Sequence, residues 1–345
     1  HYPLRRQRQM CIRDRLKEGG YTSAVFGKWH LGYKPEFNPL LHGFDQFNGF
    51  ISGNIDAHSH FDRMIIKDWW QNQELKDEAG YLTDLITEHT IKFIQQNKDR
   101  PFFIYAAHGA PHSPHQARGS KIVRGPEKGK IPQWGKGNGI YSDDPKDENW
   151  LIKHFILPVD EGLGRICKEI EVLGLAENTI IWFISDNGGT AGNKTTSPMT
   201  RAGKGSTYEG GHRVPGIVWA PNRIGPGKCG ELIVGMDIMP TSLAMAKVVI
   251  PQKHRFDGID VGPAIFEKKN LPERPVIWGK NSSGALRRGP WKLVKNELYN
   301  LYDNPRERKN LALKYPHRVK QMIKERSVIY KEAIGDSPYD NRINK

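Results

Sequence analysis

Two oxygen-bearing side chains and a lysine stand close together near the middle of the chain. Asp186 and Asn187 directly follow the apolar run 180–184, and Lys204 lies between two glycines in the turn 203–211. The run favours a buried strand, and ligands of open α/β sheets bind where strands end. Carboxylate and amide oxygens suit a hard cation, while an exposed lysine attracts an anion. The segment therefore predicts a metal-assisted site for an anionic group.

Two further segments carry basic side chains at the ends of expected strands. Residues 21–30 are expected to form a strand with Lys28 and His30 on one face. The apolar run 102–106 is followed by His108, His112 and His115. Histidines at the carboxyl end of a strand are candidates for general acid or base catalysis. For both segments the alternative is an ordinary polar surface.

The rest of the chain alternates strands with helices as far as residue 255. Apolar residues at helical spacing predict helices over 81–97 and 149–173. The alternation is typical of an α/β fold with a mostly parallel, mixed central sheet and helices on both faces. After residue 256, four short strand candidates and a helix over 318–333 predict a small antiparallel sheet packed with a helix. We therefore expect an α/β domain over 16–255 and an α+β subdomain over 256–345.

The charge balance indicates anionic partners. The chain of 345 residues has 52 Lys and Arg against 38 Asp and Glu, a formal net charge of +14. Such a balance favours nucleic acid, anionic lipid, or sulfated or phosphorylated sugars. The sequence has no nucleic-acid-binding signature, so we expect no nucleic acid partner, and it has no apolar run of 18 residues that would predict a membrane span. The three cysteines show neither CxxC pairing nor metal-ligand spacing.

Two segments allow more than one interpretation. Residues 54–70 combine histidines, aspartates and aromatic residues, which suits either a sugar pocket or a folded surface excursion. Residues 1–15 are basic and lack periodicity, and we expect them to be a disordered or foreign leader.

Four segments together resemble the sulfatase family, and they occur in that family's order. They are GYTSAVFGKWHLG (20–32), AAHGAPHSPH (106–115), SDNGG with GKGSTYEGGHRVPGIVWAP (185–189 and 203–221), and ALRRGPWKLV with ELYNLYDNPRERKNLA (285–294 and 297–312). The resemblance spans roughly residues 16–315. It implies the alkaline-phosphatase-like fold and hydrolysis of sulfate esters with one divalent cation, usually calcium, held by Asp186 and Asn187.

The resemblance also implies roles for the basic residues. Lys204 would bind a sulfate oxygen and the bridging oxygen, Lys28 and His30 would contact the nucleophile and the sulfate, and His112 would protonate the leaving alcohol. The family's nucleophile is formylglycine, made from the first residue of a Cys/Ser-x-Pro/Ala-x-Arg motif. The family leads us to expect a periplasmic, secreted or lysosomal-type compartment. A sulfated carbohydrate is the preferred substrate, because the basic charge and residues 54–70 favour it over a steroid or lipid.

The start of the chain departs from the family pattern. In the family, the nucleophile motif and the first metal-binding aspartates precede the GKWHLG segment by several tens of residues, whereas nineteen residues precede Gly20 here. Cys11 is a chance match to the motif, because Arg13 stands at the Pro/Ala position. We therefore expect an N-terminally truncated domain that lacks the nucleophile and is inactive as given. Two alternatives are a phosphoester or phosphonate hydrolase of the same superfamily and a non-catalytic binder of sulfated glycans.

Overall fold

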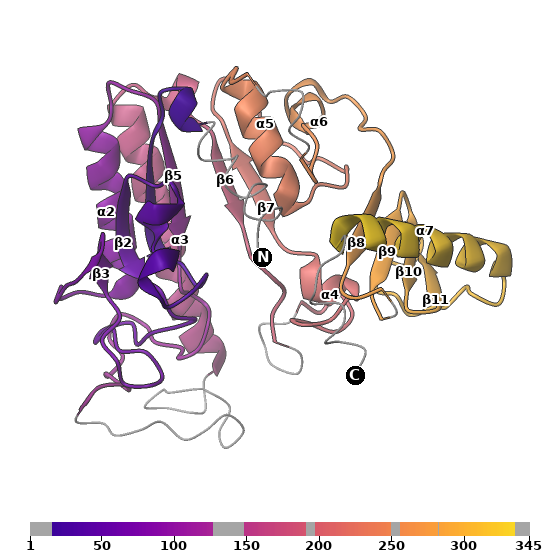
Figure 1. Ribbon diagram of the computed structural model, residues 1–345, viewed down its shortest axis with the longest axis horizontal. Coiled ribbons are helices and arrows are strands. Elements are labelled where there is room, and N and C mark those ends of the chain that lie inside the picture. The colour runs from indigo at the N-terminus through magenta and orange to yellow at the C-terminus, as the bar shows by residue number, and fades with distance from the viewer. Residues whose placement is uncertain (1–15, 127–147, 191–196, 250–255, 282, 335–345) are drawn as a thin grey trace. The chain divides into compact units, whose positions relative to one another are not determined.

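The computed structural model describes residues 16–126, 148–190, 197–249, 256–281 and 283–334 (Figure 1). The chain divides into two compact units, and each is described by itself. The first contains residues up to Ile181 together with Trp219–Gly227 and Val234–Gly262. The second contains Trp182–Val218, Lys228–Ile233 and the residues from Pro263 onward. The expected leader 1–15 and Cys11 lie outside the described residues, and the division at residue 255 stays a prediction.

A five-stranded mixed sheet forms the centre of the first unit. Its order is β4-β3-β2-β1-β5; β1 pairs in parallel with β2 and β5, whereas β3 pairs antiparallel with both β2 and β4. The strands are β1 (Thr22–Lys28), β2 (Gln46–Phe50), β3 (Trp70–Gln71), β4 (Glu74–Leu75) and β5 (Phe102–Ala107). Gly27 has a φ of 100°, and a Cβ there would lie 2.1 Å from the carbonyl oxygen of Ala107. A glycine is therefore required where β1 and β5 approach, one residue before Lys28.

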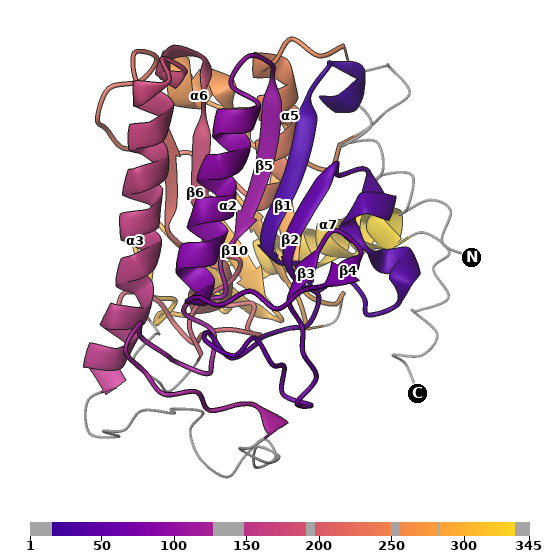
Figure 2. The ribbon, with the colours of Figure 1, turned by 90° about the vertical axis from the view of Figure 1, so that its left-hand side faces the viewer.

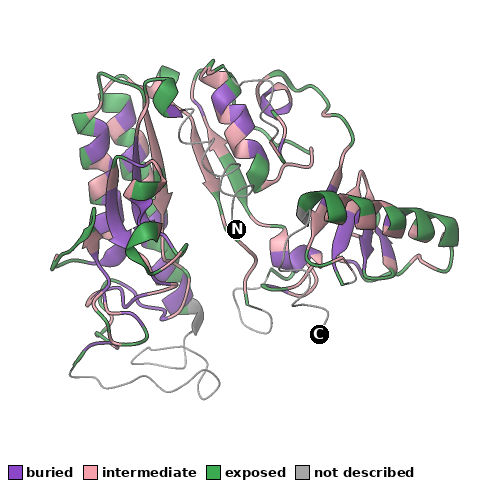
Figure 3. Ribbon diagram, viewed as in Figure 1, coloured by how far each residue is buried: buried purple, intermediate pink, exposed green. Residues whose placement is uncertain are grey.

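Two long helices cover one face of this sheet, and short 3₁₀ segments cover the other. Helices α2 (Leu82–Gln96) and α3 (Glu148–Val172) lie side by side in front of the strands (Figure 2). Phe26 and Phe93 belong to the core between the sheet and α2. On the opposite face Val25 and Phe47 pack with Leu40 of η2 (Pro39–His42), which follows η1 (Pro35–Phe37). Burial is concentrated in the central strands (Figure 3).

A four-stranded antiparallel sheet organises the second unit. Its order is β11-β10-β9-β8, and helix α7 (Pro316–Ile334) packs on one face through Met322. The strands are β8 (Pro275–Trp278), β9 (Ala285–Arg288), β10 (Trp291–Val294) and β11 (Glu297–Asn300). The opposite face packs Tyr208 against Tyr299 and Val294. This face therefore contacts the segment that carries the expected lysine turn.

The remaining elements are short. They are η4 (Ala176–Asn178), β6 (Ile181–Ile184), α4 (Glu209–His212), β7 (Gly216–Trp219), η5 (Gly235–Asp237), α5 (Ile238–Met245) and α6 (Gly262–Glu267). Strands β6 and β7 pair with each other. Among the described helices, none combines the length and the apolar character that crossing a membrane requires.

The fold class predicted from the sequence is confirmed. A mixed sheet with helices occupies the first unit, and the four strands expected after residue 256 form the small antiparallel sheet with its helix. The expected helices 81–97 and 149–173 are found as α2 and α3, each within one residue at either end. Pro158 lies inside α3, which runs as one helix on both sides of it.

Candidate active site

The end of β1 positions the first two candidate residues. Lys28 is the last residue of β1 and is partly buried, and His30 follows it with a φ of 54° and an exposed side chain. Trp29 between them is buried, and its Nε1 donates to the carbonyl of Phe37. The indole therefore anchors this turn and holds the backbone from which Lys28 and His30 extend.

The loop after β2 brings His30 and His112 to neighbouring positions. A Cβ at Gly53 would lie 2.9 Å from Nε2 of His30, so the bare glycine leaves room for that ring. The next residue, Asn54, has its side-chain nitrogen 3.3 Å from Nδ1 of His112. Both histidine rings therefore adjoin consecutive residues of one loop, as expected where strand ends gather.

The Asn54 amide is oriented by an arginine far away in the sequence. Nη1 of Arg124 donates to Oδ1 of Asn54 at 2.6 Å, and since a guanidinium can only donate, the amide nitrogen must face His112. Nδ1 of His112 also lies 2.9 Å from the carbonyl oxygen of Ser113. Sequence reasoning missed Asn54 and Arg124 as supports of His112. Asn54 stood in a segment already noted for its polar side chains, but no local pattern indicated Arg124.

The other two histidines of this loop differ from His112. Burial lowers the pKa of His108 to about 4, so its ring is neutral at physiological pH. His115 is buried and packs near Phe155 of α3. The geometry thus favours His112, which is partly exposed beside Asn54, as the acid–base residue of the three.

Residues 54–70 form a folded excursion. Asp56 is fully buried and accepts hydrogen bonds from the backbone nitrogens of His58, Ser59, Val123 and Arg124. Burial opposes ionisation of Asp56, but these hydrogen bonds outweigh it and lower its pKa. His60 and Trp69 are also fully buried, and their rings pack against each other at a tilt of 30°. Most of the polar groups that suggested a sugar pocket therefore stabilise the loop itself.

The loop after β6 carries the candidate metal ligands in the second unit. Asp186 is exposed, and the side-chain nitrogen of Asn187 donates to the carbonyl of Gly188. The backbone nitrogen of Lys204 donates to the carbonyl of Gly189 at 2.8 Å. The ligand loop and the lysine turn are therefore joined by their backbones, and the Lys204 side chain is left exposed to solvent.

The donor set fits a hard cation in part. Because the Asn187 nitrogen donates to Gly188, the side-chain oxygen of Asn187 is the atom that could ligate a cation together with the carboxylate of Asp186. Calcium takes about six to eight oxygen ligands, of which these two residues would supply two. Within the described part of the chain no cluster of three or more His, Cys, Asp or Glu residues could hold a metal.

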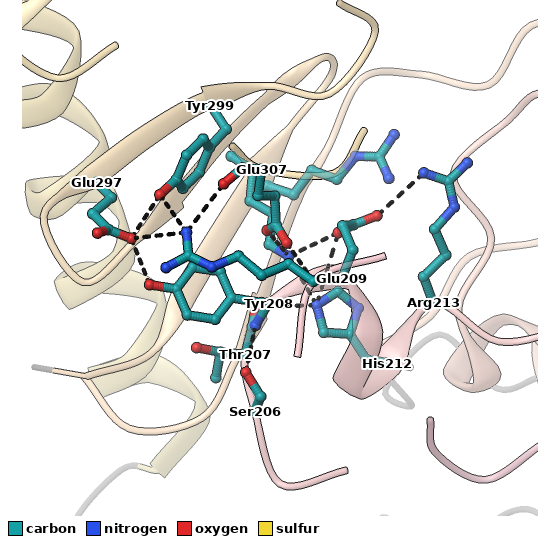
Figure 4. A network of polar contacts seen from close by, with 12 residues as sticks. Ser206, Thr207, Tyr208, Glu209, His212, Arg213, Glu297, Tyr299 and Glu307 are labelled. Atoms are coloured by element: carbon teal, nitrogen blue, oxygen red, sulfur yellow. Dashed lines mark hydrogen bonds and ion pairs between the residues drawn. The ribbon is translucent and has the colours of Figure 1, made fainter. Parts of the chain in front are cut away.

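A buried ionic cluster includes Glu209, which lies in the same turn as Lys204 (Figure 4). Nζ of Lys292 lies 2.7 Å from Oε1 of Glu209 and 2.8 Å from Oε1 of Glu307, and all three side chains are at most 1% exposed. Burial opposes ionisation of Glu209, but Lys292 holds its pKa below the ordinary value, whereas burial raises the pKa of Glu307. His212 stacks on Trp278, and burial and Lys292 lower its pKa to about 4. His212 is thus a packed neutral histidine.

The six predicted site residues fall into two groups of three. Lys28, His30 and His112 lie in the first unit, and Asp186, Asn187 and Lys204 lie in the second. Within each unit the structure brings at least two of the three together, through the loop 53–54 in the first and through the 188–189 backbone in the second.

Comparison with known proteins gives a consistent result. The model of the sulfatase family matches residues 1–248. N-acetylgalactosamine-6-sulfatase of Canis lupus familiaris is 33% identical over 282 residues, which cover 76% of this chain and 49% of that protein. The enzyme of the same name from Homo sapiens is 29% identical and covers 78% of this chain. The chain spans about half the length of the curated relatives it matches.

One solved structure shares the fold over nearly the whole chain. The crystal structure of Ps i-CgsB in complex with k-i-k-neocarrahexaose has a TM-score of 0.75 and 24% identity, and the match covers 97% of this chain and 80% of that one.

Proposed function

Because this chain belongs to the sulfatase family, we propose that the protein hydrolyses sulfate esters and that its substrates are sulfated carbohydrates. The reaction breaks the bond between sulfur and the ester oxygen and releases an alcohol and sulfate. Cations placed around the sulfate stabilise the developing charge, and an acid is needed for the departing alkoxide. The net charge of +14 and the relatives named N-acetylgalactosamine-6-sulfatase support this substrate class.

In the second unit, Asp186 and Asn187 are proposed to hold one divalent cation, with calcium the best match to oxygen ligands. When bound, the cation would polarise the sulfate oxygens. Lys204 would bind a sulfate oxygen and the bridging oxygen. The observation that supports this proposal best is the hydrogen bond from the Lys204 backbone to Gly189, because it fixes the lysine turn against the ligand loop.

In the first unit, His112 is proposed to protonate the leaving oxygen, and Lys28 and His30 to contact the nucleophile and the anionic sulfate. The adjoining contacts of His30 with Gly53 and His112 with Asn54 support a shared site for these two rings. A histidine acid of this kind contributes roughly 10²- to 10⁴-fold to rate. It matters most where the leaving alcohol is a poor leaving group.

The nucleophile is proposed to be a formylglycine outside the described residues, and the chain of 345 residues is proposed to be inactive by itself. Purified chain that hydrolyses an aryl sulfate well above background would refute the second statement. The sulfatase family also supports the proposal of a periplasmic, secreted or lysosomal-type compartment.

The deciding experiment assays the full-length protein on matched sulfate, phosphate and phosphonate esters, with and without chelator. Preference for sulfate, lost in Lys204→Ala, is expected. Preference for phosphate would instead indicate the phosphoester hydrolase of the same superfamily. If no ester is cleaved, and salt-sensitive binding to a sulfated polysaccharide survives both chelation and Lys204→Ala, the protein is a glycan binder.

A further inference from the structure

Helix α4 contacts both the loop that carries Asp186 and Asn187 and the turn that carries Lys204. Its two central glycines leave no space for side chains: a Cβ at Gly210 would lie 2.2 Å from the carbonyl oxygen of Ala202, and one at Gly211 would lie 2.0 Å from that of Ser206. The nitrogen of Gly188 also donates to the carbonyl of Gly211 at 3.0 Å. A displacement of α4 would therefore displace the backbone segments that carry Asn187 and Lys204.

The first and last residues of α4, Glu209 and His212, both contact the side chain of Lys292. Nζ of Lys292 donates to Oε1 of Glu209 at 2.7 Å and to Nε2 of His212 at 3.0 Å. Glu307 completes the cluster, because its Oε1 forms an ion pair with Lys292 and its Oε2 accepts from the backbone nitrogen of Glu209 at 2.7 Å. Figure 4 shows Glu209, His212 and Glu307 turned toward one another. Two of the three ammonium donors are therefore hydrogen-bonded to α4, and the contact with Oε1 of Glu307 is an ion pair.

Lys292 is not required for the core between its own sheet and α7. Its neighbours on β10, Trp291 and Leu293, point to the α7 side, where they pack with Met322. Lys292 points to the opposite face, near the ring of Trp278. The buried ammonium group of Lys292 therefore binds side chains of α4, whereas other residues form the hydrophobic core between the sheet and α7.

We propose that Lys292 is a positioning residue of the candidate active site, which holds α4 at both ends and thereby fixes Lys204 and the loop of Asp186 and Asn187. The catalytic part of this inference rests on the proposed function. The mechanical part does not, because it concerns only the backbone hydrogen bonds of Gly188 and Lys204. Removing Lys292 would leave Glu307 buried without this cation and Glu209 with the longer contact to Arg213, so α4 is expected to separate from the sheet.

The test is amide hydrogen exchange on the folded chain, followed at Gly188 and Lys204. Lys292→Met is expected to accelerate exchange at both amides by tenfold or more and to leave the β9–β10 amides protected. The matched control is Arg288→Met on the neighbouring strand, whose side chain pairs with Glu325 of α7 on the opposite face. This control is expected to leave Gly188 and Lys204 unchanged.

A second variant covers the case in which Lys292→Met unfolds the unit. Glu307→Gln keeps the Lys292–Glu209 pair and is expected to accelerate exchange at Gly188 and Lys204 by a smaller factor. Unchanged exchange at these amides in both variants would overturn the proposal, and so would equal loss of protection at β10 and Lys204. If exchange behaves as expected but the full-length protein cleaves no sulfate ester, the proposed function fails and the positioning role stands.

Discussion

The side-chain nitrogen of Asn54 faces Nδ1 of His112 at 3.3 Å, and the orientation is set by Arg124, which donates to the other end of the amide. The contact joins the loop after β2 to the loop after β5. It contributes to fixing the plane of the His112 ring through Nδ1. The pair therefore leads to a direct test of the proton donor.

Replacing Asn54 by leucine should weaken His112 as an acid without removing it. In the full-length protein we expect Asn54→Leu to lower kcat by about tenfold for esters with poor leaving groups, and less for activated aryl esters, since only the former need the proton. His112→Ala should show the same selectivity with a larger loss. His58→Gln, which changes a neighbouring side chain bonded to the carbonyl of Ala117, is the control. Equal losses on both ester classes would contradict the acid role.

A methyl group at Gly53 should displace His30. Because the added Cβ would approach Nε2 to 2.9 Å and Cε1 to 3.0 Å, the ring must move away from its present position. Misplacing a catalytic group by about 1 Å can cost on the order of 100-fold in rate, so we expect Gly53→Ala to lower kcat/KM by about 10- to 100-fold. Gly125→Ala is the matched control, since a Cβ there meets nothing within 4 Å. Full activity in Gly53→Ala would show that the position of His30 does not matter.

The sequence predicted local elements well and long-range contacts poorly. The strands after residue 275 were found because tight turns separate short apolar runs, and α2 was found because its apolar residues recur at helical spacing. Each of these signals lies within one element. Residues 54–70 show the limit, since their composition suited a pocket and a folded loop equally well.

The supports of the candidate site came from the structure alone. Asn54 and Arg124 are 70 positions apart, and Glu209 and Lys292 are 83 apart. No periodic pattern in the sequence indicates either pair, because each contact depends on how separate elements pack. The roles of Asp186, Asn187 and Lys204 were implied by family resemblance and remain proposals.

Removing a candidate metal ligand should weaken calcium binding in the full-length protein. Asp186→Ala takes away a carboxylate, and we expect the Kd for calcium to rise by at least about tenfold, as even outer supports of metal sites contribute this much. Calorimetric titration measures the change directly. Asp303→Ala, an exposed aspartate of the same unit, is the control. The chain of 345 residues should bind calcium weakly, because its described residues offer two ligands at this site.

Acid should destabilise the first unit through His60. This ring is fully buried against Trp69, and burial, with a smaller effect of Lys67, lowers its pKa from 6.5 to about 4. The unfolded chain then binds the proton more tightly than the folded chain does. The contribution of neutral His60 to stability is therefore present above pH 6.5 and is lost as the pH falls toward 4.

The size of this effect can be isolated by removing the titrating group. From the two pKa values, His60 should lower the free energy of unfolding by about 2 kcal/mol between pH 7 and pH 5. His60→Asn tolerates the backbone φ of 59° and removes the titration, so its stability should fall less over this range, although a cavity lowers its stability at every pH. Denaturant unfolding at several pH values measures, for the original protein and for His60→Asn, the slope of the unfolding free energy against pH. His317→Asn, at an exposed position, should keep the slope of the original protein, and an identical slope in His60→Asn would show that other groups cause the acid sensitivity.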